Sequence, residues 1–316
     1  MQYRPLGSSG LRISEVSLGS WLTFGNAVDE GKSVACVRRA HELGINFFDT
    51  ADVYADGEAE RVLGRALSAF PRDSFVVGTK CFFPRVRDRA RRGLGRTHVL
   101  ASVDESLGNL GLDAIDLMQC HRFDPETPLE ETVQAMGDAM AAGKVRHWGV
   151  SRWTAAQMAE ASAIASSLGV PAPVSHQPPY NALNRSAEEE FAATAALGVG
   201  IVVYSPLAQG VLTGKYAEGV PSGSRGANAG TRDGMWDLKP AQIVRSARFR
   251  GVAQGLGIEA AALALAWCLR RPEVTSTIVG ASRPEQLDAN IRASGLKYGD
   301  DVWAAVDSAL AATEEG

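Results

Sequence analysis

The chain has 316 residues, of which 45% are hydrophobic and 22% charged, with a net charge of −4, so it has the statistics of an ordinary globular protein with one large or two average domains. The slightly acidic balance argues against nucleic acid or an anionic membrane as a partner, because both require clustered basic surface. Four dispersed cysteines, an N-terminus unlike a signal peptide and the lack of any apolar run near ~18 residues lead us to expect a cytoplasmic protein without a membrane span.

The first predicted element is a hairpin with strands over Gln2–Leu6 and Leu11–Ser14, joined by the turn sequence GSSG. After it, short apolar strands alternate with amphipathic helical stretches, which is typical of a parallel sheet. The predicted strands are Val16–Leu18, Ile45–Asp49, Phe75–Lys80, Ile115–Cys120, Val145–Val150, Val174–Gln177, Ile201–Tyr204 and Thr277–Gly280. The predicted helices between them are Gly31–Leu43, Glu58–Ala69, Thr97–Leu110, Leu129–Ala142, Ala155–Leu168, Ala187–Leu197 and Ala241–Leu256.

Eight such units in roughly 250 residues favour a closed (β/α)8 TIM barrel over an open doubly wound sheet, and no GxGxxG motif follows the first strand. We therefore expect a single barrel domain over residues 1–316, with the hairpin at its N-terminus. Two further helices, Glu259–Arg271 and Asp300–Ala312, do not fit the repeat. We expect them to be C-terminal additions packed on the barrel.

Two segments depart from the repeating pattern. Arginines are concentrated between Arg85 and Arg96, in RVRDRARRGLGR; a solvated loop is the favoured interpretation, and an anion or partner site is the alternative. The segment Ala208–Pro240 has no clear period and is rich in Gly, Ser, Asn and Asp. Irregular segments of this length in compact domains are usually functional or disordered.

Polar residues or glycine stand at the ends of most predicted strands. In a (β/α)8 barrel the active site is built from several carboxyl ends of strands at once. The residues at or just after these ends are Asp49, Lys80, His121, Ser151, Gln177, Ser205 and Gly280. Chance would rarely produce this placement, so the pattern predicts one shared cavity.

Four residues of this set and its flanks make chemical sense together: Asp49, Tyr54, Lys80 and His121. A phenol has an ordinary pKa of about 10 and becomes a competent acid where a cation lowers that pKa, which is the role expected of Lys80 with Asp49 as its orienting partner. A neutral His121 can donate a hydrogen bond to a substrate carbonyl. This chemistry suits hydride addition to a C=O group, and the hydride must come from a nicotinamide because no side chain supplies one.

Several long, ordered motifs resemble those of the aldo-keto reductase family, and most closely its branch that contains the voltage-gated potassium-channel beta subunits. The resemblance covers nearly the whole chain. The motifs are YRPLGSSGLRIS, SWLTFGN, FFDTADVYADGEAERVLG, GTKCFF, RGLGRTHVLASVDESLGNLGLDAIDL, WGVSRW, YSPLAQGVLTGKY and IVGASRPEQLDAN.

The resemblance implies a role for each matching residue. Tyr54 would be the proton donor, and Asp49, Lys80 and His121 would complete the tetrad. The implied contacts of the nicotinamide end are Ser151, Arg152 and Gln177, with Tyr204 stacking on the ring. The implied pyrophosphate contacts are Ser205, Leu207, Lys215 and Arg225, and those of the adenosine phosphate are Gly280, Ser282, Gln286 and Asn290. Further cofactor contacts are expected at Ser20, Trp21, Asp49, Pro206, Gln209 and Arg283.

The expected partner is a small-molecule carbonyl substrate, with contacts at Trp21, Tyr54, Phe82, His121 and Trp153. These aromatic residues just beyond strand ends, with Phe83 and Phe123, could also be ordinary core; an aromatic wall is the favoured interpretation. No histidine pair has metal-ligand spacing, so we expect no metal. A homo-oligomer is possible.

Arg283, beside Ser282, could reach a 2′-phosphate, so NADPH is the expected cofactor and NADH the less favoured one. Ala289 stands where the family often has a glutamate. Three functions stay open: an NADPH-dependent reductase of aldehydes or ketones, an NADP(H)-binding regulatory or redox-sensing subunit of channel-beta type, and a biosynthetic keto-sugar reductase. His121 favours an enzyme, since the channel subunits often carry asparagine there.

Overall fold

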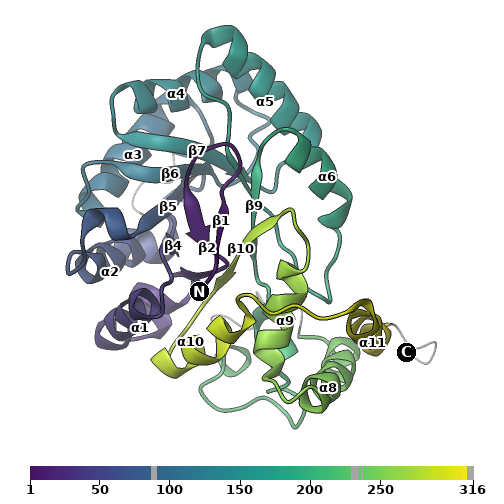
Figure 1. Ribbon diagram of the computed structural model, residues 1–316. Helices are drawn as coiled ribbons and strands as arrows, with labels where there is room; N and C mark the ends of the chain where they lie inside the picture. The colour runs from purple at the N-terminus through teal and green to yellow at the C-terminus, as the bar shows by residue number, and fades with distance from the viewer. Residues whose placement is uncertain (87–90, 229–234, 236–237, 312–316) are drawn as a thin grey trace.

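In the computed structural model, eight parallel strands close into a barrel in the order β10–β3–β4–β5–β6–β7–β8–β9 (Figure 1). The structure describes residues 1–86, 91–228, 235 and 238–311. The barrel strands are β3 (Val16–Gly19), β4 (Phe47–Asp49), β5 (Val76–Cys81), β6 (Ile115–Cys120), β7 (Val145–Ser151), β8 (Ser175–Gln177), β9 (Gly200–Tyr204) and β10 (Val274–Val279). The predicted (β/α)8 barrel is confirmed, although β10 begins at Val274 rather than Thr277.

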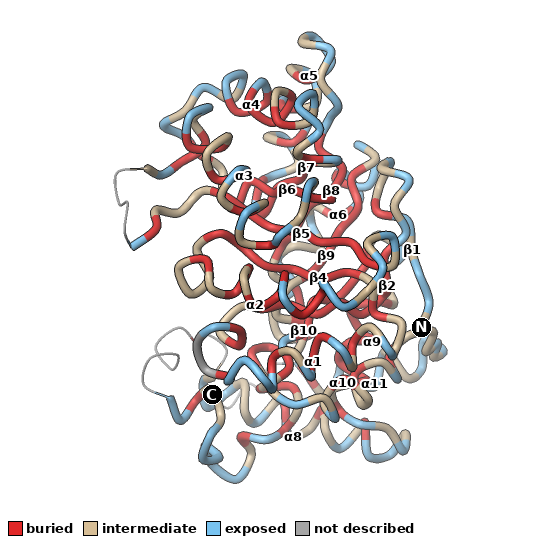
Figure 2. Tube along the Cα trace, turned by 90° about the vertical axis from the view of Figure 1, so that its left-hand side faces the viewer, coloured by how far each residue is buried: buried red, intermediate tan, exposed pale blue. Residues whose placement is uncertain are grey.

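Helices form the outer layer around the strands (Figure 1). They include α1 (Glu30–Glu42), α2 (Glu58–Leu67), α3 (Arg96–Leu110), α4 (Leu129–Ala141), α5 (Ala155–Leu168) and α6 (Glu188–Ala196). The apolar period explains why each helix lies on the barrel: in α2 the buried residues Ala59, Val62, Leu63, Ala66 and Leu67 recur on one face. Figure 2 shows burial concentrated in the strands and in the inner faces of the helices.

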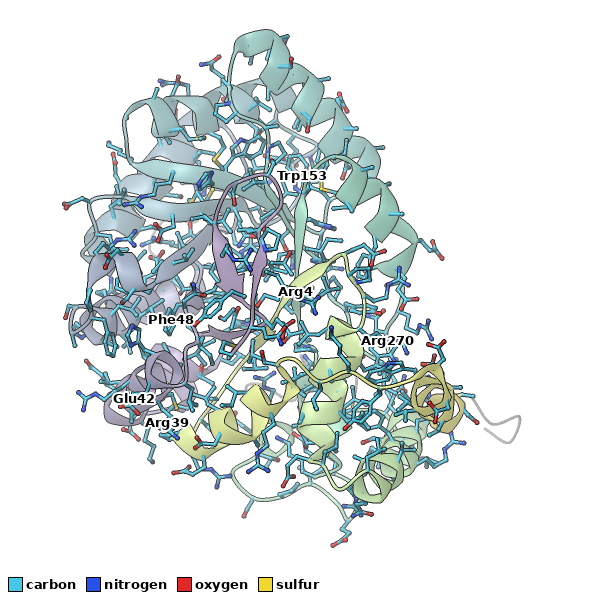
Figure 3. The ribbon with its side chains drawn as sticks, viewed as in Figure 1. Arg4, Arg39, Glu42, Phe48, Trp153 and Arg270 are labelled. Carbon is cyan, nitrogen blue, oxygen red and sulfur yellow. The ribbon has the colours of Figure 1, made fainter. Side chains whose placement is uncertain are left out.

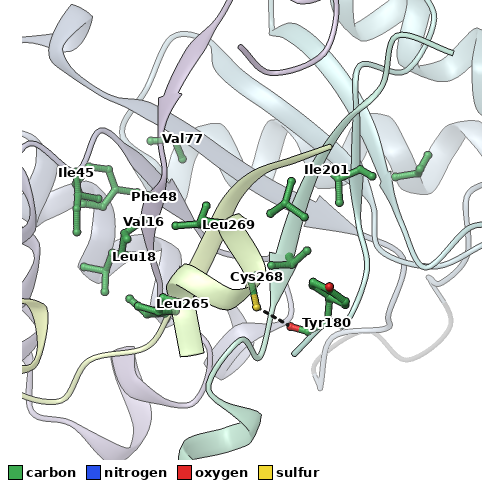
Figure 4. Packing of buried hydrophobic residues seen from close by; sticks show 14 of the residues in the cluster. Val16, Leu18, Ile45, Phe48, Val77, Tyr180, Ile201, Leu265, Cys268 and Leu269 are labelled. Atoms are coloured by element: carbon green, nitrogen blue, oxygen red, sulfur yellow. Dashed lines mark hydrogen bonds between the residues drawn. The ribbon is translucent and has the colours of Figure 1, made fainter. Parts of the chain in front are cut away.

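The C-terminal helices differ from our expectation. Among the described residues between β9 and β10, α8 (Pro240–Gly255) packs on α11 (Asp300–Leu310), whereas α9 (Ala260–Leu269) contacts β10. Leu265, Cys268 and Leu269 of α9 belong to the main core together with Val16 (Figure 4). The helix expected over Glu259–Arg271 is therefore present as α9 and packs on the barrel as predicted, but it precedes β10 instead of following the last strand, and α8 and α11 form the outer pair.

A short helix, α10 (Pro284–Asn290), follows β10 and was not predicted. Its seven residues span too few turns for an apolar period to be visible in the sequence. The helix expected over Asp300–Ala312 is confirmed as α11, but Ala312 itself lies outside the described residues, as do 229–234 and 236–237 of the irregular segment.

The predicted N-terminal hairpin is confirmed as β1 (Tyr3–Pro5) paired antiparallel with β2 (Arg12–Ser14). It closes the amino ends of the barrel strands, where Leu6 and Ile13 pack in a cluster with Phe47, Val76, Leu117, Val174, Val202 and Ile278. Arg4 joins the hairpin to the barrel, since its guanidinium donates to the carbonyl oxygens of Val274 at 2.7 Å and Leu269 at 2.9 Å (Figure 3). With this end sealed, the opposite end of the barrel is left for a site.

The arginine-rich run after β5 is only partly the solvated loop that we expected. Arg85 is 5% exposed, with its guanidinium 3.0 Å from Glu105 and 3.8 Å from Glu60. Arg91 also pairs with Glu105, at 2.6 Å. The carboxylates that pair with Arg85 and Arg91 lie on α2 and α3, so the sequence of the run itself did not indicate these ion pairs. Residues 87–90, which include Arg87 and Arg89, lie outside the described residues.

Within the described ranges, no single helix has the length and apolar composition to cross a membrane. Helices α8 and α9 together meet those two criteria as a pair bent by 95°.

Candidate active site

The carboxyl ends of the strands bring the predicted polar residues to one rim of the barrel. Parallel pairing keeps neighbouring ends level: Ser151 pairs with Gln177, and Lys80 pairs with Gln119 one residue before Cys120. Asp49 is the last residue of β4, and His121 directly follows β6. The register therefore gathers at one end of the barrel residues that lie far apart in the sequence.

A buried hydrogen-bonded network lies under this rim. The Lys80 ammonium, 0% exposed, donates to Asp49 Oδ2 at 2.7 Å and to the Thr50 carbonyl at 2.6 Å. The Gln177 amide donates to Asp49 Oδ1 at 2.8 Å. A buried ion pair costs less when its remaining polar atoms are hydrogen-bonded, as both carboxylate oxygens are here. Asp49 is therefore positioned as an orienting partner of Lys80, and Gln177, expected only as a cofactor contact, helps to hold it.

Tyr54 begins η2 (Tyr54–Gly57), just after β4. Its ring centre lies 5.1 Å from Lys80 Nζ and 5.9 Å from the His121 ring, edge to face. Ala55 and Asp56 take left-handed backbone conformations, with φ of 49° and 53°. Non-glycine residues rarely adopt this conformation without a tertiary reason. The loop is thus held in a strained form that presents the phenol at the rim.

The pKa of Tyr54 does not follow our expectation. We predicted that Lys80 would lower it; instead burial, and secondarily the negative charge of Asp49, raise the pKa of Tyr54 well above its ordinary value. The physical reason is that Asp49 lies 2.7 Å from the ammonium and offsets its charge. Arg122 is the cation that opposes the rise. The phenol is therefore fully protonated at neutral pH.

His121 is held in its neutral form. Its ring lies edge-on to Phe83, with ring centres 5.0 Å apart, and Phe83 is in turn edge-on to Phe82 at 5.0 Å. Burial moves the pKa of His121 well below its ordinary value, and the charges of Lys80 and Arg122 act in the same direction. A neutral imidazole can donate one hydrogen bond without carrying charge, which agrees with the role expected from the sequence.

Two charged residues of the site were missed at the level of sequence. Arg122 follows His121, donates a hydrogen bond to the His121 carbonyl through Nη1, and lies over the Phe83 ring at 5.3 Å. Asp52, behind Tyr54, is 0% exposed, and burial followed by repulsion from Glu60 raises its pKa to about 7. Neither residue stands inside a strand end, so the pattern of ends did not include them. A charge within two residues of a predicted catalytic side chain is the signal that could have found both.

The residues expected to contact a cofactor lie along one arc of the rim. Ser20 and Trp21 follow β3, Arg152 follows β7, Ser205, Pro206 and Leu207 follow β9, Gln209 lies in η4 (Ala208–Thr213), and Ser282 and Arg283 precede Gln286 and Asn290 of α10. Several are fixed by hydrogen bonds: Ser151 Oγ donates to the Gln177 carbonyl at 2.8 Å, and Gln286 Oε1 accepts from the Ser282 amide at 2.8 Å.

Backbone strain concentrates on this rim. Within the described part of the chain, the non-glycine residues with positive φ are Leu22, Ala55, Asp56, Arg152, Ser205, Ala208 and Gln209, and all of them follow carboxyl ends of barrel strands. Strained conformations persist only where the surrounding structure over-determines them, and they cluster at functional sites. The strain marks the rim as a site independently of side-chain chemistry.

The segment after β9 folds back across the barrel end and carries positive charge. Arg225 lies over the Trp21 ring at 5.4 Å, and one of its nitrogens is 4.0 Å from where a Cβ on Gly280 would stand. Lys215 lies over the Tyr216 ring at 5.1 Å. An anionic dinucleotide is bound by cations, by hydroxyl groups and by backbone that it can approach closely. This end of the barrel offers Lys215 and Arg225, hydroxyl groups at strand ends, and the backbone of Gly280, which has no side chain. The residues present therefore fit a nicotinamide dinucleotide.

The aromatic residues expected to contact substrate are packed differently from one another. Trp153 is 2% exposed and lies edge-on to Phe123 at 5.0 Å, so it is mainly a wall. Phe82 is half-buried. A separate hollow of about 670 Å³ lies between α2 and α3, near Phe70, Arg72 and Gly111, on the side of the amino ends of the strands and not at the candidate site. No cluster of three or more potential metal ligands occurs among the residues the structure describes.

Comparison with known proteins gives a consistent result. The model of the aldo/keto reductase family matches residues 15–311. A probable voltage-gated potassium channel subunit beta from Oryza sativa subsp. japonica is 40% identical, over 93% of this chain and 91% of that protein. One from Arabidopsis thaliana is 41% identical with the same coverage. A putative one from Schizosaccharomyces pombe is 39% identical, over 92% and 87%.

Proposed function

This chain belongs to the aldo/keto reductase family, and from that premise we propose that it is an NADPH-dependent carbonyl reductase that converts aldehydes or ketones to alcohols. The observation that carries the proposal is the pairing of a protonated Tyr54 with a neutral His121 over the Lys80–Asp49 ion pair. We propose in addition that the protein acts in the cytoplasm as a single domain.

Each residue has a distinct part in the proposed reaction. The Tyr54 hydroxyl and the His121 imidazole donate hydrogen bonds to the carbonyl oxygen, which polarises the C=O bond. The nicotinamide, when bound, supplies the hydride that reaches the carbonyl carbon. Tyr54 gives its proton to the oxygen as negative charge develops there. The phenolate that remains lies beside the Lys80 ammonium, 5.1 Å from the ring centre, whose charge Asp49 offsets in part.

The cofactor would be held by the arc of the rim described above. Ser151, Arg152 and Gln177 would hold the nicotinamide end, and Lys215 and Arg225 the pyrophosphate. Arg283 is exposed, and its backbone amide donates to Gln286 Oε1 at 3.2 Å. The guanidinium of this residue supports a preference for the 2′-phosphate of NADPH. This preference is tested by comparing the dissociation constants of NADPH and NADH for the wild-type chain and for Arg283→Ala. The dissociation constant of NADH divided by that of NADPH should be smaller in Arg283→Ala than in the wild type.

The central test is Tyr54→Phe, assayed as NADPH oxidation with an aldehyde. Loss of the proton donor should lower kcat by about 10²- to 10⁴-fold, while NADPH still binds. The phenylalanine ring keeps the packing against His121, so the thermal midpoint should stay close to that of the wild type. A Tyr54→Phe protein with undiminished turnover would refute the mechanism.

A second candidate function comes from the names of the relatives, which are described as channel beta subunits. In that case the protein would hold NADP(H) as a regulatory or redox-sensing subunit with slow turnover, and could assemble with copies of itself. Multiple turnovers of NADPH with any member of a panel of aldehydes and ketones favour the enzyme. A single turnover followed by retention of NADP⁺ favours the regulatory subunit. Including keto-sugars in the panel tests the third candidate, a biosynthetic keto-sugar reductase.

A further inference from the structure

We propose that Arg122 binds an anionic group of the substrate, so that the preferred substrates are carbonyl compounds that also carry a carboxylate. This inference rests on the proposed carbonyl reduction and adds the substrate class to it. Arg122 belongs to none of the residues expected to act in catalysis or in cofactor binding. It nevertheless contacts the backbone of His121 and the ring of Phe83, which lies edge-on to the His121 ring.

The position of Arg122 is fixed relative to the proton donor. Its Nη1 donates to the carbonyl of His121, and its guanidinium carbon lies 5.3 Å from the centre of the Phe83 ring. The Phe83 ring is 5.0 Å from the His121 ring, and the His121 ring is 5.9 Å from that of Tyr54. Arg122 and the two groups that would hold the carbonyl oxygen therefore share one aromatic scaffold.

The guanidinium has no acidic partner in the described part of the chain. Other arginines near the barrel pair with carboxylates, as Arg72 does with Asp116 at 2.7 Å and Arg96 with Asp138 at 2.8 Å. The groups that shift the pKa of Arg122 are instead the phenols of Tyr54 and Tyr204 and a second cation, Arg152, and the Arg122 charge in turn lowers the pKa of Lys80 and of His121. Half-burial without a counter-ion costs free energy that a bound anion would recover.

The electrostatics around Arg122 favour an anion rather than a neutral group. Burial, and then the positive charge of Arg152, lower the pKa of Arg122 from its ordinary value. A guanidinium nevertheless stays charged at neutral pH. Two cations beside each other at the rim create a positive potential. A guanidinium matches a carboxylate geometrically, since it can donate two parallel hydrogen bonds. Among the described residues, Nη1 of Arg122 is the nitrogen that has an acceptor, the His121 carbonyl.

The location of Arg122 favours the substrate over the cofactor as the source of that anion. The expected pyrophosphate and adenosine contacts follow β9 and β10, whereas Arg122 follows β6 and stacks on Phe83, which follows β5. In the closed barrel β5 and β6 are neighbours and lie apart from β10, and the groups Tyr204 and Arg152 that act on Arg122 belong to the expected nicotinamide end, not to the pyrophosphate or adenosine contacts. The Arg122 guanidinium thus lies on the part of the rim where Phe82, Phe83 and His121 meet.

The test compares 4-carboxybenzaldehyde with its methyl ester, which differ in charge but share the reacting aldehyde. The wild-type protein should prefer the acid in kcat/KM. Because Arg122 also acts on the pKa values of Tyr54 and His121, its removal changes turnover with both substrates, and the decisive quantity is the ratio between them. In Arg122→Leu the acid-to-ester ratio of kcat/KM should fall about ten- to hundredfold, the size expected for a charge-assisted hydrogen bond. Arg122→Lys should retain part of the preference. The control is Arg92→Leu, since Arg92 is 64% exposed and paired with Glu126.

A binding measurement makes the inference independent of turnover. The affinity of benzoate for the NADP⁺-loaded protein, measured by calorimetry, should be at least about tenfold weaker in Arg122→Leu. Equal benzoate affinity in the two proteins would overturn the inference. So would an unchanged acid-to-ester ratio together with weaker NADPH binding, which would assign Arg122 to the cofactor. If the wild type reduces neither aldehyde, the proposed function fails, and the benzoate affinities alone decide the role of Arg122.

Discussion

Asp52 is a carboxyl group placed where its charge is poorly tolerated. It is 0% exposed, and neither oxygen has a hydrogen-bond partner of good geometry in the described part of the chain; the Ser102 hydroxyl and the Val53 amide are only near enough to oppose the effect of burial. Glu60 adds repulsion, and Arg85 offsets part of it. The result is a pKa of about 7, close to neutral pH.

This raised pKa predicts how Asp52→Asn changes stability with pH. Because the folded pKa lies above that of an unfolded aspartate, about 3.9, the wild type is most stable below pH ~4 with respect to this group and loses that contribution as pH rises to about 7. Asparagine has no proton to lose. The free energy of unfolding of Asp52→Asn relative to wild type should therefore rise between these pH values, by at most about 4 kcal/mol.

Urea unfolding at a series of pH values measures this difference. Asp113→Asn is the control, since Asp113 is exposed whereas Asp52 is buried. A difference between Asp52→Asn and wild type that stays constant from acid to neutral pH would show that Asp52 is not titrating in this range. If Asp52→Asn instead loses stability relative to the wild type as pH rises, the charged form of Asp52 stabilises the fold, and the pKa of Asp52 is lowered and not raised.

At the residue scale, the sequence predicted which residues lie at the candidate site, but it did not predict the charges and burial around each of them. Asp49, Lys80 and His121 were found because strand ends in a parallel barrel meet at one rim. The pKa of Tyr54 was predicted in the wrong direction, since it depends on the distance between Asp49 and Lys80 and on burial. The role proposed for Arg122 depends on the absence of a carboxylate partner among the described residues. These quantities come from contacts between strands that are remote in the sequence.

The packing of helices on each other can be tested at a glycine. Gly64 lies on α2 where a Cβ would stand 2.3 Å from the backbone carbonyl oxygen of Leu110 at the end of α3. Backbone cannot rotate away as a side chain can, so Gly64→Ala should force the two helices apart and lower the free energy of unfolding by about 1–3 kcal/mol. Urea unfolding followed by circular dichroism measures the change.

Gly108 provides the matched control for this prediction. It lies on α3, is exposed, and has no atom within 4 Å of the position a Cβ would take. Gly108→Ala should therefore be neutral or raise the free energy of unfolding by up to about 1 kcal/mol, because alanine favours the helix. Equal effects of the two substitutions would mean that helix propensity, and not the contact with Leu110, decides the outcome.

At the scale of elements, periodicity predicted the helices that have two different faces and misassigned those that do not. The face of α2 that carries Val62 and Leu63 is visible in the sequence. Helix α9 is apolar on every side because it lies between the barrel and other helices, so its sequence gives no direction. For that reason the sequence did not show which elements α9 connects, and α10 was missed because it is short.

The whole molecule is held together at the end of the barrel opposite the candidate site. Glu15, 3% exposed, lies between β2 and β3 and accepts hydrogen bonds from Arg4 Nε at 2.7 Å, from Ser294 Oγ at 2.9 Å and from the Gly295 amide at 2.9 Å. It therefore joins the N-terminal hairpin to the segment after α10. This contact joins the first residue of the family-matched region, which spans 15–311, to a segment in its C-terminal part, which favours one cooperative unit.

Glu15→Ala tests this view of the molecule as one domain. The substitution leaves three donors without their acceptor, so the free energy of unfolding should fall by about 2 kcal/mol or more. Because Trp148 lies in β7 and Trp303 in α11, tryptophan fluorescence and circular dichroism sample different layers. In a single domain the two urea transitions should shift to lower concentration together with the same slope. Separate transitions, in the wild type or in the variant, would contradict the single domain expected from the sequence.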